Sequence, residues 1–415
     1  MTVKLQTPED FLLAAKHAEI RSFRQLAINC ELTLGVSLLI HALQRERGLS
    51  NGYLKSVGQR FSQQRMTQIE LCQQAEQQFR DSLKLITEPN PFHDSSRLLS
   101  SIAFVIQSLN ELPILREKIT LLRSNAIEST QAISSLVAGL LAVVFETADI
   151  STDPDITRAL AAMFNFMQGK EYAGQERAWG AIGFTAGQFE QEQLDRLKNI
   201  LHAQQRCFDI FEQLASPSIS QEWSRLVSND LATEIQKLRT VLQRLSAQQT
   251  VSTELSEIWY DLTTERIDKM HVLEQQLSTD LMQLSQSKLK DAEQELKHYQ
   301  NRIETSAGIQ PPTTTLLNLP LEPTIPQAAD TTIYHLLQDQ TVRLQQLSNE
   351  LAEARQALTE RKLLERAKGL LMQYRQLTEE QAYRQLRESA MESNQTLTVV
   401  AQKVIKAINH IKSSQ

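Results

Sequence analysis

The sequence predicts an all-α protein in which a large bundle of long helices precedes a small C-terminal bundle of three helices. Only 12 of the 415 residues are glycine and 11 are proline, so few positions interrupt a helix. Apolar residues recur at helical spacing along most of the chain, whereas no run of alternating β-branched residues is long enough to predict a strand. The length is sufficient for two or three domains, each with its own core.

An arginine lies on the apolar face of the second predicted helix. A first helix is predicted from Phe11 to about Ala27, and a longer one follows from about Leu32 to Val57. One stripe of the longer helix is apolar except for a serine and an arginine; it consists of Leu32, Val36, Leu39, Ile40, Leu43, Arg47, Ser50, Leu54 and Val57. Arg47 therefore points inward, while Arg45 lies about 200° away on another face. An inward charge needs a partner or a ligand, because its burial alone is costly.

Two more inward cations follow further along the chain. The next predicted helices cover residues 60–85, 97–123 and 127–148, and Pro154 then suits the first turn of another helix. The inward stripe of that helix reads Met163, Met167, Lys170, Gly174, Arg177, Ala181 and Phe184. Its segment Glu176-Arg177-Ala178-Trp179 repeats the pattern of Glu46-Arg47-Gly48-Leu49. The two motifs together predict two arginines facing each other across one bundle interior.

Two facing arginines repel each other unless an anion lies between them. A planar oxyanion offers each guanidinium two acceptors in one plane, a match that lysine cannot reproduce. The alternative is that the chain's own carboxylates are the partners, with Arg47 paired to Glu176 or Glu171 and Arg177 paired to Glu46. Spacing alone leaves both possibilities open.

These motifs resemble the NIT family of nitrate- and nitrite-sensing domains. The resemblance rests on residues 43–54, on Lys170-Glu171 and on Glu176-Arg177-Ala178, within about residues 30–270. It implies an all-helical receptor that binds nitrate or nitrite and needs no cofactor. The implied anion ligands are Arg47 and Arg177, with Arg45 and Lys170 as further candidates and Glu46, Glu171 and Glu176 as orienting partners. Candidates for a third arginine, which the sequence does not distinguish, are Arg116, Arg225 and Arg239.

The segment after this region predicts a linker and a coiled coil. One very long helix is predicted from Leu255 to about Arg302. Five of the eleven prolines then fall between residues 306 and 330, as expected of a linker or an extended arm. Leucines seven residues apart follow at Leu337, Leu344, Leu351 and Leu358, with Leu347 and Ala354 at the companion positions. This short coiled-coil seam favours a homodimer, although it can also dock on the receptor's own helices.

The last part of the chain predicts three short helices. The first continues from the coiled coil through residues 363–375, and Thr378 with Gln381 has the spacing of a capping box for the second. The pattern breaks at Asn394–Thr396, before a third helix. The residues Arg366–Met372, followed by Glu380, Ala382, Tyr383, Leu386, Arg387, Ala401 and Val404, resemble the ANTAR family of RNA-binding antiterminator domains. The resemblance implies binding to hairpins in an mRNA leader, which prevents a terminator from forming.

The charge distribution agrees with a nucleic-acid-binding end. From Arg361 onward there are ten basic and five acidic residues, a net +5; since the whole chain carries −6, residues 1–360 carry −11. A basic module on an acidic chain is typical of a polyanion binder. The candidate RNA-binding residues are Arg366, Lys368, Arg375, Tyr383, Arg384 and Arg387. The alternative is that these cations cover solvated helix faces and that Tyr383 belongs to the core.

Four regions are predicted: a NIT-like sensor domain at 1–305, a Pro-rich linker at 306–331, a coiled-coil segment at 332–360 and an ANTAR-like domain at 361–415. No Gly-rich phosphate loop, metal-binding Cys/His spacing or nucleophile elbow is present, so no enzyme, catalytic residue or metal is predicted. Three distant cysteines predict a reducing cytoplasm. The most apolar stretch, 133–145, is too short to cross a bilayer, and no signal peptide precedes it.

A nitrate-sensing domain followed by an ANTAR domain implies a transcription antiterminator that responds to nitrate and nitrite and acts at nitrate-assimilation genes. Its expected partners are the anion, leader mRNA hairpins and a second copy of the chain, with neither DNA nor membrane. The alternative function is an anion-sensing signalling protein that acts through a protein partner rather than RNA. In either case we expect the anion to shift the protein between two packed states.

Overall fold

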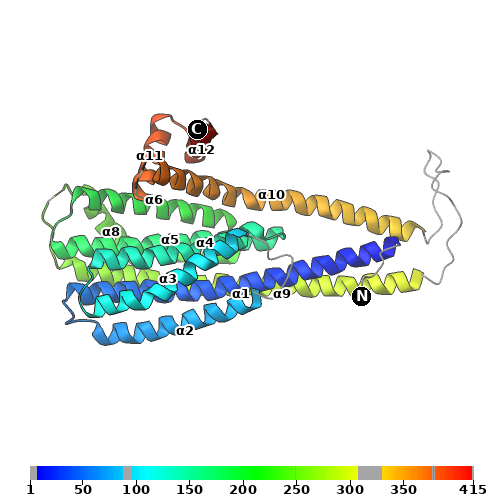
Figure 1. The fold of residues 1–415 in the computed structure, drawn as a ribbon, viewed down its shortest axis with the longest axis horizontal. Helices are drawn as coiled ribbons and strands as arrows, with labels where there is room; N and C mark the ends of the chain where they lie inside the picture. Colours follow the sequence, from blue (N-terminus) through cyan, green and yellow to red (C-terminus); the bar gives the residue numbers. More distant parts are fainter. Residues whose placement is uncertain are drawn as a thin grey trace.

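The computed structural model describes residues 7–86, 96–306 and 330–413, except residues 248, 376 and 378. Within these ranges the chain forms helices α1 to α12, and its β-structure is limited to an isolated antiparallel bridge between Gln188 and Thr250. Figure 1 shows the long helices lying side by side along the longest axis, with the short helices α11 and α12 stacked beyond α6. The predicted all-α class is confirmed.

The first helix, α1 (Pro8–Lys55), is longer than predicted. It begins with a capping box, in which Thr7 and Asp10 each accept a hydrogen bond from the other's backbone N–H. The break expected between residues 27 and 32 is wrong, because no glycine or proline interrupts this stretch. Its polar groups also find partners inside the helix: Gln25 donates to Asn29 Oδ1 at 3.2 Å, and Thr33 Oγ1 donates to the Asn29 carbonyl at 3.0 Å.

The next helices surround α1. They are α2 (Ser62–Ile86), α3 (Ser96–Thr120), α4 (Ala126–Ile150) and α5 (Pro154–Ala186). The predicted start of α5 at Pro154 is confirmed, and Asp153 caps it by accepting a hydrogen bond from the Ile156 N–H at 2.9 Å. Helix α4 packs against α1 and α5. The inward stripes of these helices form one continuous apolar core.

The second half of the large bundle adds α6 (Gln191–Leu214), α7 (Pro217–Val227), α8 (Asp230–Arg244) and the long α9 (Leu255–Ser306). Helix α9 lies against both α1 and α5. A separate aromatic core joins α5, α6 and α7 through Phe166, Phe208, Phe211 and Trp223. The contacts of α1, α5 and α9 with one another bring both arginine motifs into the same interior.

The C-terminal bundle consists of α10 (Asp330–Arg375), α11 (Glu379–Glu392) and α12 (Leu397–Ser413). Its small core contains Ala367, Leu371, Ala382, Leu386, Ala401 and Ile405. The break predicted before α12 is confirmed, and Asn394 there has a φ of 49°, in the left-handed region. The predicted cap Thr378 and most of the predicted linker lie outside the described residues.

The predicted coiled-coil seam lies within α10 and packs on the chain's own helices. Ala354 and Leu358 are buried, and Leu358 belongs to the same apolar core as residues of α4 and α5. Arg355 Nη2 donates to the Ser151 carbonyl at 2.8 Å, and Lys362 pairs with Asp149 at 2.7 Å. At these positions the seam packs on the chain's own helices, which is the second of the two possibilities that the sequence left open. The side chains of Leu337 and Leu344 lie outside the described residues.

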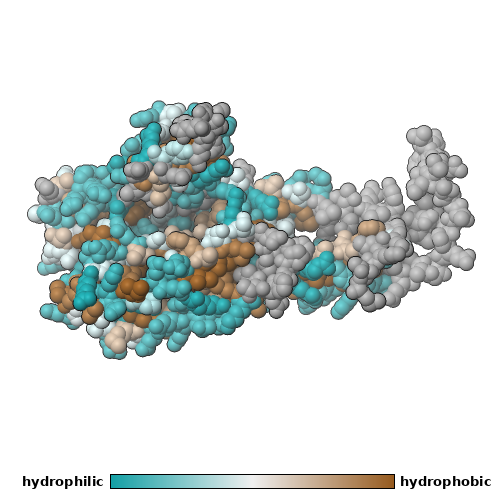
Figure 2. Space-filling model, in the orientation of Figure 1, coloured by the Kyte–Doolittle hydropathy of each residue, from teal (hydrophilic) through white to brown (hydrophobic). Residues whose placement is uncertain are grey.

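Three of the described helices have the length and composition to cross a membrane: Asp10–Lys55, Ser96–Thr120 and Ala126–Ile150. In α1 most of the apolar window is buried inside the bundle, whereas in α3 only 28% is buried. The outward face of α3 exposes Leu99, Phe104 and Ile114. Figure 2 shows separate hydrophobic patches among hydrophilic side chains on the visible face of the molecule.

Candidate functional site

Arg47 lies in the interior between α1, α4 and α5, and 1% of it is exposed. Its Nη1 donates to Glu171 Oε1 at 2.5 Å, and its Nη2 donates to Glu171 Oε2 at 3.1 Å. Nη1 also donates to Ser134 Oγ of α4 at 2.6 Å. The planar guanidinium therefore meets the carboxylate with two parallel bonds. The pairing of Arg47 with Glu171 is one of the alternatives that the sequence left open.

Arg177 lies near Arg47 and is held by neutral groups. Its Nη1 donates to Thr264 Oγ1 of α9 at 3.0 Å, its Nη2 donates to the Gln44 carbonyl at 3.1 Å, and its Cζ lies 5.4 Å from the centre of the Tyr260 ring. No carboxylate of the described residues makes an ion pair with it within 4.0 Å. Burial lowers the pKa of Arg177, and the charge of Arg47 lowers that pKa further. The interior thus contains a cation without a direct counter-charge.

Two glycines make room for the guanidinium groups. A Cβ atom at Gly174 would lie 2.5 Å from Arg47 Nη2, and a Cβ atom at Gly48 would lie 2.9 Å from Arg177 Nη2. Each arginine therefore presses against the backbone of the helix that carries the other one. The small residues of the two sequence motifs permit this close approach at some cost in helix propensity.

Gln44 connects the two arginines. Its carbonyl accepts from Arg177, while its side-chain Nε2 donates to Glu171 Oε2 at 2.9 Å. Two buried polar atoms here, Arg47 Nε and Gln44 Oε1, have no hydrogen-bond partner among the described residues. The set of Arg47, Glu171 and Arg177 has two cations and one carboxylate, so its net charge is +1. This matches the charge of one monovalent anion.

The other glutamates of the motifs pair elsewhere. Glu46 accepts two bonds from Arg116, at 2.9 and 2.8 Å, and Glu176 accepts two from Arg239, at 2.7 and 2.6 Å. The alternative pairings of Arg177 with Glu46 and of Arg47 with Glu176 are therefore wrong. Each glutamate points in a different direction from the neighbouring arginine, because adjacent helical residues point about 100° apart.

Lys170 forms a separate buried pair with Glu274 of α9. Glu274 also accepts from Ser37 Oγ at 2.9 Å and lies 3.3 Å from His271 Nδ1. Burial opposes ionisation of this carboxyl, but the adjacent Lys170 and His271 hold its pKa at about 2. The charge of Lys170 is therefore already matched inside the protein.

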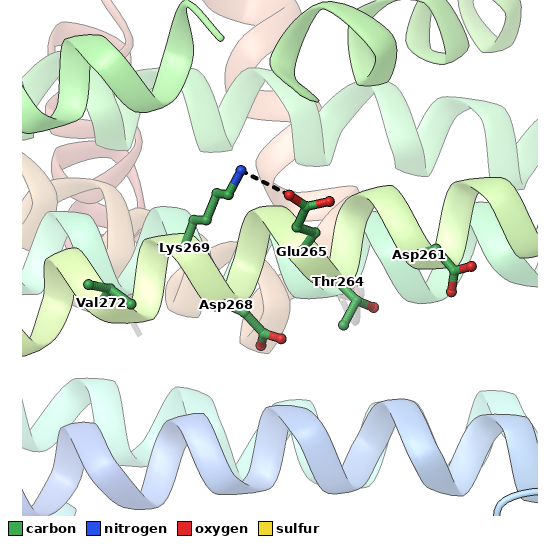
Figure 3. A pocket seen from close by; sticks show the side chains of 6 residues that line it. All are labelled: Asp261, Thr264, Glu265, Asp268, Lys269 and Val272. Atoms are coloured by element: carbon green, nitrogen blue, oxygen red, sulfur yellow. Dashed lines mark ion pairs between the residues drawn. The ribbon is translucent and has the colours of Figure 1, made fainter. Parts of the chain in front are cut away.

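Thr264 also lines a cavity of about 450 Å³ along α9. The other lining residues are Asp261, Glu265, Asp268, Lys269 and Val272. In Figure 3, Thr264, Asp261 and Asp268 point to one side of α9, whereas Glu265 and Lys269 point to the other and form an ion pair. Three carboxylates against one ammonium make this lining acidic, so it repels an anion.

The sequence candidates differ in their placement. Arg45 is exposed on the other face of α1, as its helical phase predicts, and lies apart from the buried pair. Gln44 and Thr264 were not predicted, because a backbone carbonyl and a hydroxyl carry no charge signal. Arg266 was missed too, although it lies on the inward face of α9 beside Ile267 and Met270. The described residues contain no group of three or more His, Cys, Asp or Glu that could hold a metal ion.

The predicted RNA-binding residues fall into three sets by exposure. Arg366, Arg375 and Arg384 are exposed. Lys368 is buried and pairs with Glu365 at 2.9 Å. The remaining two, Tyr383 and Arg387, are partly buried.

Tyr383 and Arg387 of α11 lie against α6 of the large bundle. Arg387 Nη1 donates to Asn199 Oδ1 at 2.9 Å and lies 3.2 Å from His202 Nδ1. The guanidinium of Arg206 stacks over the Tyr383 ring, 4.8 Å from its centre. In this arrangement, the face of α11 that carries these two side chains is occupied by the chain itself.

Comparisons with known proteins agree with both resemblances. Residues 38–282, more than half of the chain, match the family described as nitrate and nitrite sensing, and residues 352–405 match the ANTAR domain. The chain is 33% identical over 402 residues to the nitrate regulatory protein of Klebsiella oxytoca, covering 96% of this chain and 95% of that protein. It is also similar to the solved structure of the NasR transcription antiterminator, with a TM-score of 0.63 and 30% identity over 96% of this chain and 98% of the other.

The buried pair of Glu46 and Arg116 generates a stability prediction. We expect Glu46→Gln to lower the free energy of unfolding by about 3–5 kcal/mol, because it leaves a buried guanidinium without its counter-charge. The control is Glu257→Gln, which breaks the exposed Arg60–Glu257 pair and should cost about 1 kcal/mol or less. Urea denaturation of both variants measures the difference. Equal losses would contradict a structural role for the buried pair.

The close approach at Gly174 generates a second prediction. We expect Gly174→Ala to destabilise the protein by about 1–3 kcal/mol, because the new Cβ collides with Arg47. The matched control is Gly369→Ala in α10, where a Cβ meets nothing within 4 Å. That variant should gain about 0.5–1 kcal/mol from helix propensity. Thermal unfolding compares the two, and a stabilised Gly174→Ala protein would show that the interior has spare room.

Proposed function

Because the chain belongs to the nitrate- and nitrite-sensing NIT family and ends in an ANTAR domain, we propose that it is a transcription antiterminator that responds to nitrate and nitrite. In this proposal the large helical bundle binds the anion. The C-terminal bundle then binds hairpin RNA in an mRNA leader and prevents termination at nitrate-assimilation genes. The observation that carries the anion-binding part is the buried Arg177, which has no carboxylate partner among the described residues.

Nitrate or nitrite binds between Arg177 and Arg47. A planar monoanion supplies the one negative charge that the set of Arg47, Glu171 and Arg177 lacks, and it accepts bonds from two guanidinium forks. The unpartnered Arg47 Nε is one donor available to it. Low polarity around the site strengthens this attraction relative to water. Neutral Gln44 and Thr264, which now hold Arg177, can yield their bonds to the anion at small cost.

The remaining candidates take supporting roles. Glu171 orients Arg47, while Glu46 and Glu176 orient Arg116 and Arg239 through two bonds each. Lys170, paired to Glu274, adds a neighbouring cation rather than a direct ligand. Arg45 reaches the anion only if its exposed side chain turns inward, so it has the smallest role of the four cations.

RNA binds to the C-terminal bundle through the exposed cations Arg366, Arg375 and Arg384 together with Lys368, Tyr383 and Arg387. Arginines hold phosphates, while the Tyr383 ring stacks on an unpaired loop base, which is the usual way in which proteins recognise RNA loops. Tyr383 and Arg387 can serve only after α11 leaves α6, because both are engaged there.

The contact between α11 and α6 supports a switch between two packed states. Without the anion, the protein holds α11 against α6 and keeps part of the RNA-binding surface covered. With the anion, the charge between α1, α5 and α9 is neutralised, these helices draw together, and the packing that holds α10 and α11 is weakened. A ligand shifts such an equilibrium only by its difference in affinity for the two states.

The rest of the assignment extends the same proposal. The matched families are regulatory, which supports a protein without catalytic activity that uses nitrate or nitrite as a ligand and no cofactor. We place it in the cytoplasm, away from the membrane, as a homodimer that binds RNA and not DNA. An ANTAR domain favours this output over a protein partner.

The anion site is tested by calorimetry with nitrate. We expect Arg177→Gln to weaken nitrate binding at least about tenfold, since a charged hydrogen bond contributes about 1.5–3 kcal/mol. The control is Arg45→Gln on the exposed face of α1, which should bind nearly as the unchanged protein does. Nitrite should also bind, whereas phosphate should not. An Arg177→Gln protein with unchanged nitrate affinity would overturn the assignment.

The switch is tested by RNA gel shifts on the full chain. We expect Arg206→Ala, which removes the stacking partner of Tyr383, to bind a leader hairpin without nitrate, because the covered state loses a contact. The control is Lys198→Ala, an exposed neighbour on α6, which should still require nitrate. If Arg206→Ala keeps the full nitrate requirement, the contact between α11 and α6 does not restrain RNA binding.

A further inference from the structure

A second cavity lies in the large bundle, and none of its lining residues belongs to the proposed nitrate site. Helices α6, α7, α8 and α9 line it, and its volume is about 520 Å³. Small-molecule sites usually measure about 300–1,000 Å³. A nitrate ion is only slightly larger than a water molecule, whose share of liquid volume is about 30 Å³. The cavity is therefore suited to a much larger ligand than the anion of the proposed function.

The lining of this cavity carries an excess positive charge. Arg239 and Arg266 both line it, and they share one carboxylate, Glu176. Arg239 takes both oxygens of Glu176, while Arg266 Nη2 donates to Gln204 Oε1 at 3.0 Å. Arg266 Nη1 makes no hydrogen bond among the described residues and lies 3.6 Å from Glu176 Oε2. Since Arg266 is only 9% exposed, this leaves a buried donor without an acceptor.

Part of the lining is apolar and closely packed. Trp223 and Ile235 are 2% and 1% exposed, and Phe208 packs against Trp223 with ring centres 4.5 Å apart. Trp223 Nε1 donates to Glu212 Oε1 at 2.6 Å, which fixes the plane of the indole. A ligand that fills the cavity therefore meets both a buried cation and aromatic rings.

We propose that this cavity binds a small organic carboxylate with an aromatic or branched aliphatic body. The carboxylate accepts from Arg266 Nη1, which supplies the missing acceptor and the missing negative charge in one group. The body of the ligand packs against Trp223 and Phe208, where it replaces water on apolar surface. A neutral ligand would leave the Arg266 donor unsatisfied. A small inorganic anion would leave the aromatic side chains in contact with water.

The position of the cavity on α6 gives the ligand a regulatory role. Gln204 and Phe208 line the cavity, while Asn199, His202 and Arg206 on the same helix hold α11. A carboxylate on Arg266 competes with Gln204 for that arginine and so changes the packing of α6. The organic acid therefore acts as a second effector beside nitrate. Binding of the organic acid is independent of the proposed function. Only its effect on RNA binding rests on that function.

The test is calorimetry of the full chain with phenylacetate as the probe and 2-phenylethanol as its uncharged analogue. We expect phenylacetate to bind at least tenfold more tightly than 2-phenylethanol. Arg266→Gln should weaken phenylacetate binding at least tenfold, and so should Val227→Trp, which fills the exposed rim of the cavity without touching the buried charges. The control is Arg225→Gln, which removes an exposed arginine that pairs with Glu222 and does not line the cavity. This variant should leave phenylacetate binding unchanged.

Two outcomes would overturn the proposal: no phenylacetate binding to the unchanged protein, or equal binding by the unchanged protein and Val227→Trp. If circular dichroism shows that Arg266→Gln does not fold, phenylacetate binding by Val227→Trp alone tests the proposal. Nitrate titrations of the same samples keep the two sites separate, because Val227→Trp should bind nitrate normally. If the unchanged protein does not bind nitrate, the proposed function is refuted, whereas the proposal for the second cavity is not.

Discussion

The buried charge of Arg177 is the constraint on which the rest of the structure depends. A guanidinium in the interior must be compensated, and among the described residues Arg177 is contacted by a hydroxyl, a carbonyl and an aromatic ring. The other inward cations of the motifs, Arg47 and Lys170, pair with Glu171 and Glu274. The interior therefore has an uncompensated positive charge beside Arg47, which a monovalent anion can neutralise.

Helices α1, α5 and α9 surround the uncompensated charge, and α6 connects α5 to the C-terminal bundle. The first three helices cross closely enough for Gly48 and Gly174 to lie against the opposing guanidinium groups. Helix α6 packs along α5, lines the second cavity through Gln204 and Phe208, and contacts α11 through Asn199. A small shift of α5 or α6 thus changes the contacts of Tyr383 and Arg387. Packed helices tend to move between discrete arrangements, because a close-packed interior resists gradual deformation.

Much of the fold followed from periodicity, and its exceptions have local causes. The start of α5 at Pro154, the long α9 and the three C-terminal helices were predictable from apolar spacing and helix-breaking residues. The continuity of α1 was not predictable, because polar Asn29 and Thr33 suggest a break in the helix. In the structure, both side chains form hydrogen bonds within the helix. The leucine seam of α10 has the same pattern whether it pairs with a second chain or, as Leu358 does, with α4 and α5.

The sequence by itself determined that Arg47 and Arg177 point inward, because helical phase fixes direction once an apolar stripe is present. It determined too that the C-terminal end is basic and that the chain joins a nitrate sensor to an ANTAR domain. Only the tertiary structure decided which carboxylate meets which cation, so that Glu171 serves Arg47 while Arg177 is left with Thr264 and a carbonyl. Partner choice depends on distances of a few ångströms between helices far apart in the chain, and no one-dimensional pattern encodes those distances.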